Sequence, residues 1–157
     1  MCINDGVSSA KKDCLRFISI RPRSEHEMSE YLVKKEYSAD VAEAVLVWLR
    51  KNGLVNDLKF SVEWIETRLR TNPKGMRALS EELSAKGIRE DTIKKAFEAR
   101  PEARDDHKVA SIILKAKLRD LRGPKDQKFK ARLYRVLISR GIDPYVSEEV
   151  IRAILSD

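Results

Sequence analysis

The chain has 157 residues, of which 42% are apolar and 36% are charged, and it carries a net charge of +7. The low aromatic content (6%), six glycines and five prolines favour helix over sheet, and the length suits one domain or a few small modules. No apolar run is long enough to span a bilayer and no export signal is present, so we expect a cytoplasmic protein without a membrane partner. Cys2 and Cys14 are expected to be reduced thiols, with a disulfide between them as the alternative.

Apolar side chains recur at helical spacing along most of the chain, which predicts nine helices. The first is expected around residues 10–20, and the second opens at a capping box that runs from Ser24 to Glu27. The seventh is expected over about residues 104–122, and the ninth begins at Asp143-Pro144. The remaining boundaries are marked by Gly53, Asn56-Asp57, Asn72 to Gly75, Gly87, Pro101, Gly123-Pro124 and Gly141.

One short sequence motif, which we call the repeated motif, occurs three times, as EYLVKKEY (30–37), EELSAKGI (81–88) and RVLISRGI (135–142). Gly87 and Gly141 are predicted to cap helices in the left-handed conformation, whereas Glu36 stands at this position in the first copy and predicts a different cap. The repeated motif divides the nine helices into three groups of three. We therefore expect an all-α fold, an elongated tandem array of three three-helix repeats with helix-turn-helix-like modules. The expected segments are residues 1–55, which include an N-terminal extension, 56–101 and 102–157.

No active site is recognisable in the sequence, so we expect neither enzymatic activity nor a metal or cofactor. The chain lacks a glycine-rich phosphate loop, and its histidines, His26 and His107, have no metal-ligand spacing around them. Asp105-Asp106 lies at an expected helix start, where acids stabilise the helix dipole. Trp48 and Trp64 fall on apolar faces, which favours core packing over base stacking.

The positive charge is concentrated toward the end of the chain, where residues 104–157 carry a net +5. Two stripes on neighbouring helices and a cluster around the turn of the middle repeat are candidates to contact a phosphate backbone, largely without regard to sequence. The alternative is that these are ordinary solvated helix faces. The candidate residues are Lys108, Lys115, Arg119 and Arg122 in the first stripe, Lys128, Arg132 and Arg135 in the second, and Arg68, Arg70, Lys74 and Arg77 in the cluster.

The order of these elements resembles the RecX family of bacterial recombination regulators. The resemblance covers about residues 10–155 and is densest from Gly53 to Ile88. Its motif residues there are Asn56-Asp57, Phe60, Arg68, Gly75, Leu83 and Lys86-Gly87-Ile88, with RPRSEHEMSEYL (21–32) before them and VLISRG (136–141) after them. Ser61, where the family usually has Ala, Met28 in place of Leu, and Glu36 depart from the family pattern.

The resemblance implies three tandem three-helix repeats and a partner, RecA, in the filament that RecA forms on single-stranded DNA. Proteins of this kind restrain ATP hydrolysis, strand exchange and co-protease activity of the filament, and so act in recombination, DNA repair and the SOS response. We expect a monomer whose basic stripes reach the DNA and whose near-neutral N-terminal module faces protein.

Two other classes of function remain open from the sequence. A tri-helical protein that binds DNA on its own would need basic or amide residues at the start of its third helices. These helices instead begin Ser-Ala-Asp, Arg-Glu-Asp and Asp-Pro-Tyr. A scaffold of the tetratricopeptide type would need a period of about 34 residues, whereas successive leucines of the repeated motif are 51 and 54 residues apart.

Overall fold

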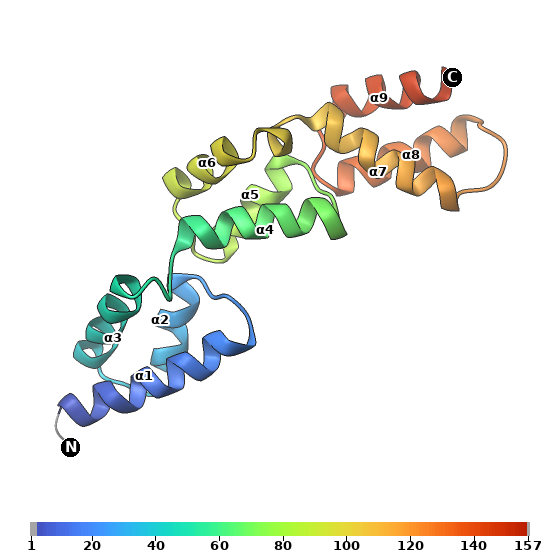
Figure 1. The fold of residues 1–157 in the computed structure, drawn as a ribbon. Helices are drawn as coiled ribbons and strands as arrows, with labels where there is room; N and C mark the ends of the chain where they lie inside the picture. Colours follow the sequence, from blue (N-terminus) through green and yellow to red (C-terminus); the bar gives the residue numbers. More distant parts are fainter. Residues whose placement is uncertain (1–2, 157) are drawn as a thin grey trace. The chain divides into compact units, whose positions relative to one another are not determined.

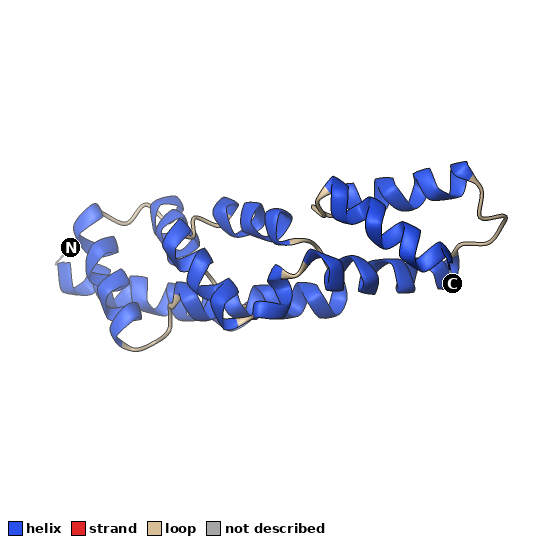
Figure 2. Ribbon diagram, turned by 90° about the horizontal axis from the view of Figure 1, so that it is seen from above, coloured by secondary structure: helices blue, strands red, loops and turns tan. Residues whose placement is uncertain are grey.

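The computed structural model describes residues 3–156, and over this range the chain forms nine α-helices, one short 3-10 helix and no strand (Figures 1 and 2). This confirms the all-α prediction. In chain order the elements are α1 (Ile3–Ile20), α2 (Glu25–Lys34), α3 (Ala39–Lys51), α4 (Asp57–Thr71), α5 (Met76–Ala85), α6 (Glu90–Ala99), η1 (Pro101–Arg104), α7 (Asp106–Asp120), α8 (Gln127–Ser139) and α9 (Pro144–Ser156).

Backbone contacts divide the chain into two compact units. The N-terminal unit comprises the chain up to Ser61 together with Leu83–Ile93, and the C-terminal unit comprises Val62–Glu82 together with the chain from Lys94 onward. Helices α4, α5 and α6 contribute residues to both units. The division into repeats at residues 55 and 101 stays a prediction.

The core of the N-terminal unit lies between α1, α2 and α3. Its fully buried side chains include Cys14, Met28, Leu32 and Leu49. Burial, and to a lesser extent the neighbouring Asp13, raises the pKa of the Cys14 thiol to about 11, so this free thiol is unreactive at neutral pH. Cys2, the other half of the alternative disulfide, lies outside the described residues.

Most helix boundaries lie at the expected signals. The Ser24 side chain accepts a hydrogen bond from the Glu27 N–H, and the Glu27 carboxylate accepts one from the Ser24 N–H, which confirms the capping box. Helix α1 begins at Ile3, seven residues earlier than expected, because the apolar face continues through Val7, which packs against the core. The short helix η1 was not predicted.

All three copies of the repeated motif end their helices with the same C-terminal cap. The residue after the left-handed position donates its N–H to the carbonyl of the repeated leucine, at 3.2 Å for Tyr37 to Leu32 and 3.1 Å for Ile88 to Leu83 and Ile142 to Leu137. The φ angles are 63° at Glu36, 77° at Gly87 and 78° at Gly141. The prediction of a different cap at Glu36 is therefore wrong.

The second and third copies also serve as joints to earlier parts of the chain, which explains why they alone require glycine. In the N-terminal unit, the Ser24 hydroxyl donates to the Lys86 carbonyl at 2.7 Å, and a Cβ on Gly87 would lie 2.3 Å from the Cβ of His26. We call this contact the N-terminal joint. Glu36, by contrast, is exposed, so its side chain extends into solvent.

The C-terminal unit contains the equivalent contact, which we call the C-terminal joint. The Gly75 N–H donates to the Arg140 carbonyl at 2.7 Å, and the Arg140 guanidinium donates to the Pro73 carbonyl at 3.3 Å. A Cβ on Gly141 would lie 2.5 Å from the Cβ of Ala78. In both joints the basic residue and the glycine of the repeated motif contact the start of the second helix in the preceding group of three. This helix is α2 in the N-terminal joint and α5 in the C-terminal joint.

We expect Glu36→Gly to stabilise the protein by about 1 kcal/mol, because a non-glycine residue is strained at positive φ. The thermal midpoint should rise by about 2–4 °C. The increase should be absent in Lys35→Gly, a matched change at the neighbouring C-cap residue, whose φ is −80°. A fall in stability for Glu36→Gly would show that the Glu36 side chain makes a stabilising contact that outweighs the strain.

Candidate nucleic-acid interface

All eleven basic candidates lie in the C-terminal unit, and seven of them belong to a bundle formed by α7, α8 and α9. The apolar faces of these helices meet in a single core. Its large buried side chains include Val109, Leu114, Leu133 and Leu137. Because this core fixes the rotation of each helix, the polar faces of α7 and α8 are directed to solvent.

On α7, Lys108, Lys115 and Arg119 are all exposed and lie within about 60° of one another around the helix axis. Arg122 was predicted to share this face, but α7 ends at Asp120 and Leu121 is already extended, with ψ of 125°. Arg122 therefore lies in the connection to α8, beyond the helical stripe. Its side chain is exposed there.

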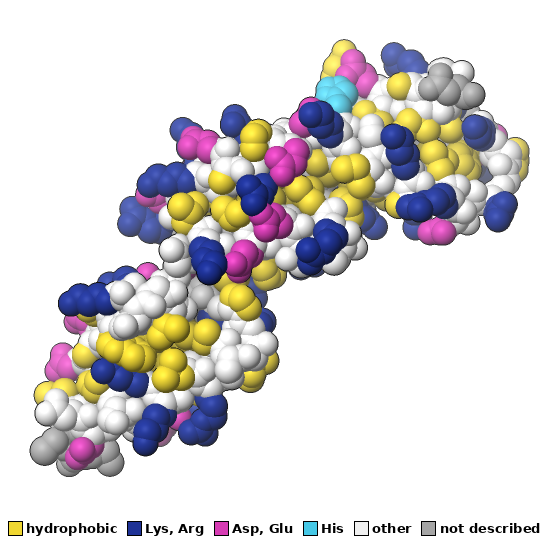
Figure 3. Space-filling view, viewed as in Figure 1, with side chains coloured by type: hydrophobic (Ala, Val, Ile, Leu, Met, Phe, Trp, Pro, Cys, Tyr) yellow, Lys and Arg dark blue, Asp and Glu magenta, His cyan; other side chains and the backbone are white. Residues whose placement is uncertain are grey.

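On α8, Lys128, Arg132 and Arg135 are exposed and also lie within about 60° of one another. Their neighbours Phe129 and Leu133 are buried in the bundle core. Within the described part of the chain, none of the seven cations of α7, α8 and their connection has a carboxylate within 4.0 Å. In Figure 3, dark-blue Lys and Arg side chains surround an apolar area on this part of the molecule, with few acidic side chains between them.

Arg68 and Lys74, two candidates of the middle cluster, form ion pairs within the protein. The Glu82 carboxylate accepts hydrogen bonds from Arg68 at 3.1 Å, from the indole of Trp64 at 2.8 Å, and from Lys74. The Arg68 guanidinium also lies 4.9 Å from the centre of the Trp64 ring. These two cations have a structural role that sequence reasoning missed, because Glu82 lies on a different helix.

The other two members of the middle cluster are free to meet a ligand. Arg70 is exposed and makes no ion pair with any described residue. Arg77 lies 3.8 Å from Glu81 one turn away, and both side chains are about three-quarters exposed (75% and 72%), so water weakens this pair.

We expect Glu82→Gln to lower the free energy of unfolding by about 1–2 kcal/mol at pH 7, since it weakens charged hydrogen bonds to a mostly buried carboxylate. Burial raises the pKa of Glu82, but the hydrogen bonds from Lys74 and Trp64 and the charge of Arg68 outweigh it, so the pKa lies below its ordinary value. This stabilisation is therefore complete above the unfolded pKa of about 4.3 and is lost as pH falls through the folded pKa.

Urea unfolding of the wild type and Glu82→Gln from pH 7 to pH 3 tests this. The difference in stability between the two should shrink toward zero at the acidic end. A difference that stays constant with pH would exclude the carboxylate charge as its cause.

The other polar candidates have structural contacts. Asp105 caps α7 by accepting hydrogen bonds from the N–H groups of His107 and Lys108; an acid was expected at this helix start for the dipole, but the N-cap itself was not predicted. His107 pairs with Glu149 at 2.9 Å, and His26 with Glu30 at 3.1 Å. No cluster of three or more His, Cys, Asp and Glu suited to a metal ion exists among residues 3–156. Trp48 packs against the N-terminal core, with the Lys11 ammonium 4.6 Å from its ring centre.

No helix in the described range is sufficiently long and apolar to cross a membrane.

Comparison with known proteins places this geometry in a family. Residues 10–49 match the first three-helix domain of RecX, and residues 56–96 match the second. The chain belongs to the RecX family. Regulatory protein RecX of Mycobacterium ulcerans is 34% identical over 148 residues, which cover 94% of this chain and 85% of that protein. Regulatory protein RecX of Streptomyces coelicolor is 31% identical over 153 residues, covering 98% and 81%.

Two solved RecX structures share the fold. RecX from Lactobacillus salivarius superposes with a TM-score of 0.79 at 16% identity, and the match covers 98% of this chain and 99% of that one. A second crystal structure of regulatory protein RecX gives a TM-score of 0.73 at 22% identity, covering 94% and 72%. The RecX fold therefore extends over α7, α8 and α9, which lie beyond the two matched domains.

Proposed function

We propose that this chain is a cytoplasmic, monomeric regulator that binds the RecA–single-stranded DNA filament and inhibits its ATPase, strand-exchange and co-protease activities. Membership in a family named for regulation supports a role in controlling RecA rather than in catalysis. The protein acts by occupying the filament.

The observation that carries the DNA part of this proposal is the set of seven exposed cations without acidic partners on α7, α8 and their connection. Unpaired cations on adjoining helices lose little on exchanging water for phosphate and release counterions from the DNA. Both stripes lie on one bundle and are held in place by one core, so a phosphate backbone meets a preformed surface. Arg70 and Arg77 extend this surface, whereas Arg68 and Lys74 help to hold the scaffold.

The alternative of an autonomous, base-reading DNA-binding protein is less well supported. A recognition helix presents its first turn to base edges. Here the first turns of α3 and α9 are engaged in capping, with the Ser38 hydroxyl accepting from Val41 N–H and the Asp143 carboxylate accepting from Tyr145 N–H. An acidic N-cap at α9 would also repel phosphate.

Binding to labelled single-stranded DNA, to RecA alone and to RecA assembled on that DNA with a slowly hydrolysed nucleotide tests the proposal. We expect binding to the filament to be at least about tenfold tighter than to either component. Equal affinity for bare DNA and for the filament would favour the autonomous DNA-binding alternative.

A further inference from the structure

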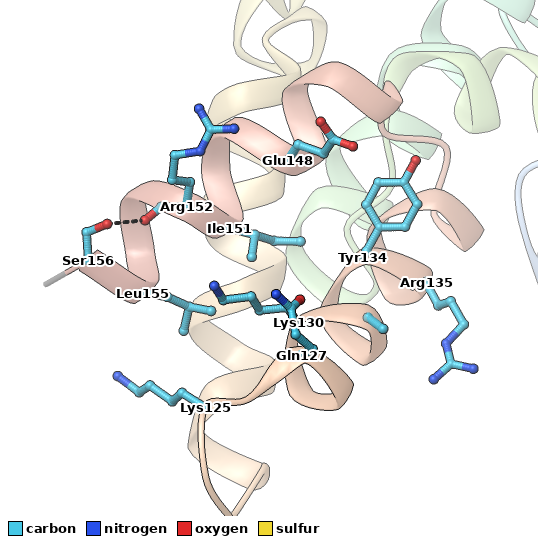
Figure 4. Close-up of a pocket in the computed structure, with 11 residues that line it drawn as sticks. Lys125, Gln127, Lys130, Tyr134, Arg135, Glu148, Ile151, Arg152, Leu155 and Ser156 are labelled. Carbon is cyan, nitrogen blue, oxygen red and sulfur yellow. Dashed lines mark hydrogen bonds between the residues drawn. The ribbon is translucent and has the colours of Figure 1, made fainter.

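A groove between α8 and α9 is separate from most of the basic stripes. Its volume is about 700 Å³, and its floor consists of apolar side chains that also pack against the bundle core. Ile151 is buried at its base, and Leu155 and Tyr134 are half-buried beside it. Figure 4 shows Ile151 and Leu155 of α9 and Tyr134 of α8 around the space between the two helices. An apolar floor of this kind can still bury a ligand's apolar side chains.

The rim of the groove is strongly positive. Lys125, Lys130, Arg135 and Arg152 line it and are all exposed, and Glu148 is the one carboxylate among its lining residues. None of these four cations has a carboxylate within 4.0 Å among the described residues. The groove therefore combines an apolar floor with a rim on which four cations outnumber the single carboxylate of Glu148.

We propose that this groove binds an acidic, amphipathic segment of a partner protein, with its apolar side chains on the floor and its carboxylates on the rim. The lining residues run from Gln127 to Arg135 on α8 and from Glu148 to Ser156 on α9. Each span is about 12 Å along the helix axis, enough for about two turns of a bound helix. Helix-in-groove binding of this kind takes its affinity from the apolar face and its specificity from the charges around it.

A protein segment fits the floor better than a nucleic acid does. Ile151, Leu155 and Ala131 are aliphatic, and Tyr134 is the single aromatic ring, whereas single-stranded nucleic acid binds through successive aromatic stacking platforms. Glu148 can accept hydrogen bonds from N–H groups of a peptide. Only Arg135 belongs to both the groove and the α8 stripe.

This inference rests on the proposed function for the existence of a protein partner, and it adds a contact to protein where the stripes contact phosphate. The two sets of residues allow a crossed experiment. Lys130→Glu/Arg152→Glu reverses two rim charges, and Lys128→Glu/Arg132→Glu reverses the same number on the stripe of α8. All four side chains are exposed, so both variants should keep the fold, which circular dichroism and thermal unfolding check.

The probe is a fluorescein-labelled helical peptide of about three turns, with leucines at i, i+3, i+4 and i+7 and glutamates at most other positions. Fluorescence anisotropy of the wild type and both variants measures its affinity. We expect the rim variant to bind the peptide about tenfold or more weakly and the stripe variant to bind it like the wild type. A second peptide with serine in place of leucine should not bind.

Three results would overturn the inference. One is wild-type peptide affinity in the rim variant, and another is equal binding of the leucine and serine peptides, which would reduce the groove to a nonspecific positive surface. The third is loss of affinity for bare single-stranded DNA in the rim variant as large as in the stripe variant, which would assign the groove to nucleic acid. Failure of the proposed function gives a different pattern, in which the wild type binds bare single-stranded DNA as tightly as the RecA–single-stranded DNA filament, whatever the two variants do with the peptides.

Discussion

Gly141→Ala is expected to lower the free energy of unfolding by about 3 kcal/mol or more, because two costs add at this position. The residue adopts φ of 78°, which is strained for any side chain. The new Cβ would also lie 2.5 Å from the Cβ and 2.9 Å from the backbone nitrogen of Ala78, so α5 must shift. Such a shift also disturbs the hydrogen bond from Gly75 N–H to the Arg140 carbonyl.

The chain offers a matched control for this substitution. Gly53 closes α3 with the same geometry, φ of 66° and a 3.0 Å hydrogen bond from Leu54 N–H to the Leu49 carbonyl, but no atom lies within 4 Å of the position that a Cβ would take there. Gly53→Ala therefore carries the conformational cost alone, about 1 kcal/mol. Chemical denaturation of both variants measures the difference. Equal losses would mean that the C-terminal joint does not require glycine for packing.

Replacing Lys115, Arg119, Lys128 and Arg132 together by glutamate is expected to weaken binding to the RecA–single-stranded DNA filament by about 100-fold at low salt. Each reversal removes a phosphate contact and adds a repulsion. Each phosphate contact on a single strand contributes about 0.7 to the slope of log affinity against log salt. If all four side chains contact phosphate, the slope should therefore become shallower by about 3.

The control for this variant reverses four exposed cations of the N-terminal unit, all of them lysines: Lys12, Lys34, Lys51 and Lys59. It has the same net charge, so any general effect of charge on the protein is held constant. We expect the control to retain the wild-type salt slope. Wild-type affinity in the quadruple variant would exclude α7 and α8 as the DNA-binding surface and would leave the family assignment unchanged.

Local signals were sufficient to predict most of the helices. The capping box at Ser24 and the helix start at Asp143-Pro144 depend on residues within one turn, so the sequence alone indicates them. Glu36 shows where this reasoning fails. Its left-handed conformation follows from the way the whole helix end closes, and the requirement for glycine at the equivalent positions comes from His26 and Ala78, which are distant in sequence.

The candidate site was predictable only in part, for the same reason. Helical spacing grouped the exposed cations of α7 and α8 as the structure has them, except for Arg122, which lies beyond the end of α7. The sequence does not show that Glu82 pairs with Arg68 of the preceding helix and with Lys74 of the turn. The groove was missed altogether because α8 and α9 each contribute one of its walls. Charge periodicity identifies a face of one helix, whereas partners and grooves depend on tertiary packing.

The most direct test of filament regulation is the rate of ATP hydrolysis by the cognate RecA on single-stranded DNA, with this protein added at substoichiometric and then saturating amounts. If this protein regulates the filament, the rate falls, while binding to bare DNA is too weak for competition to explain the fall. An unchanged rate together with strong binding to bare DNA would contradict regulation of the filament and favour a protein that acts on DNA by itself.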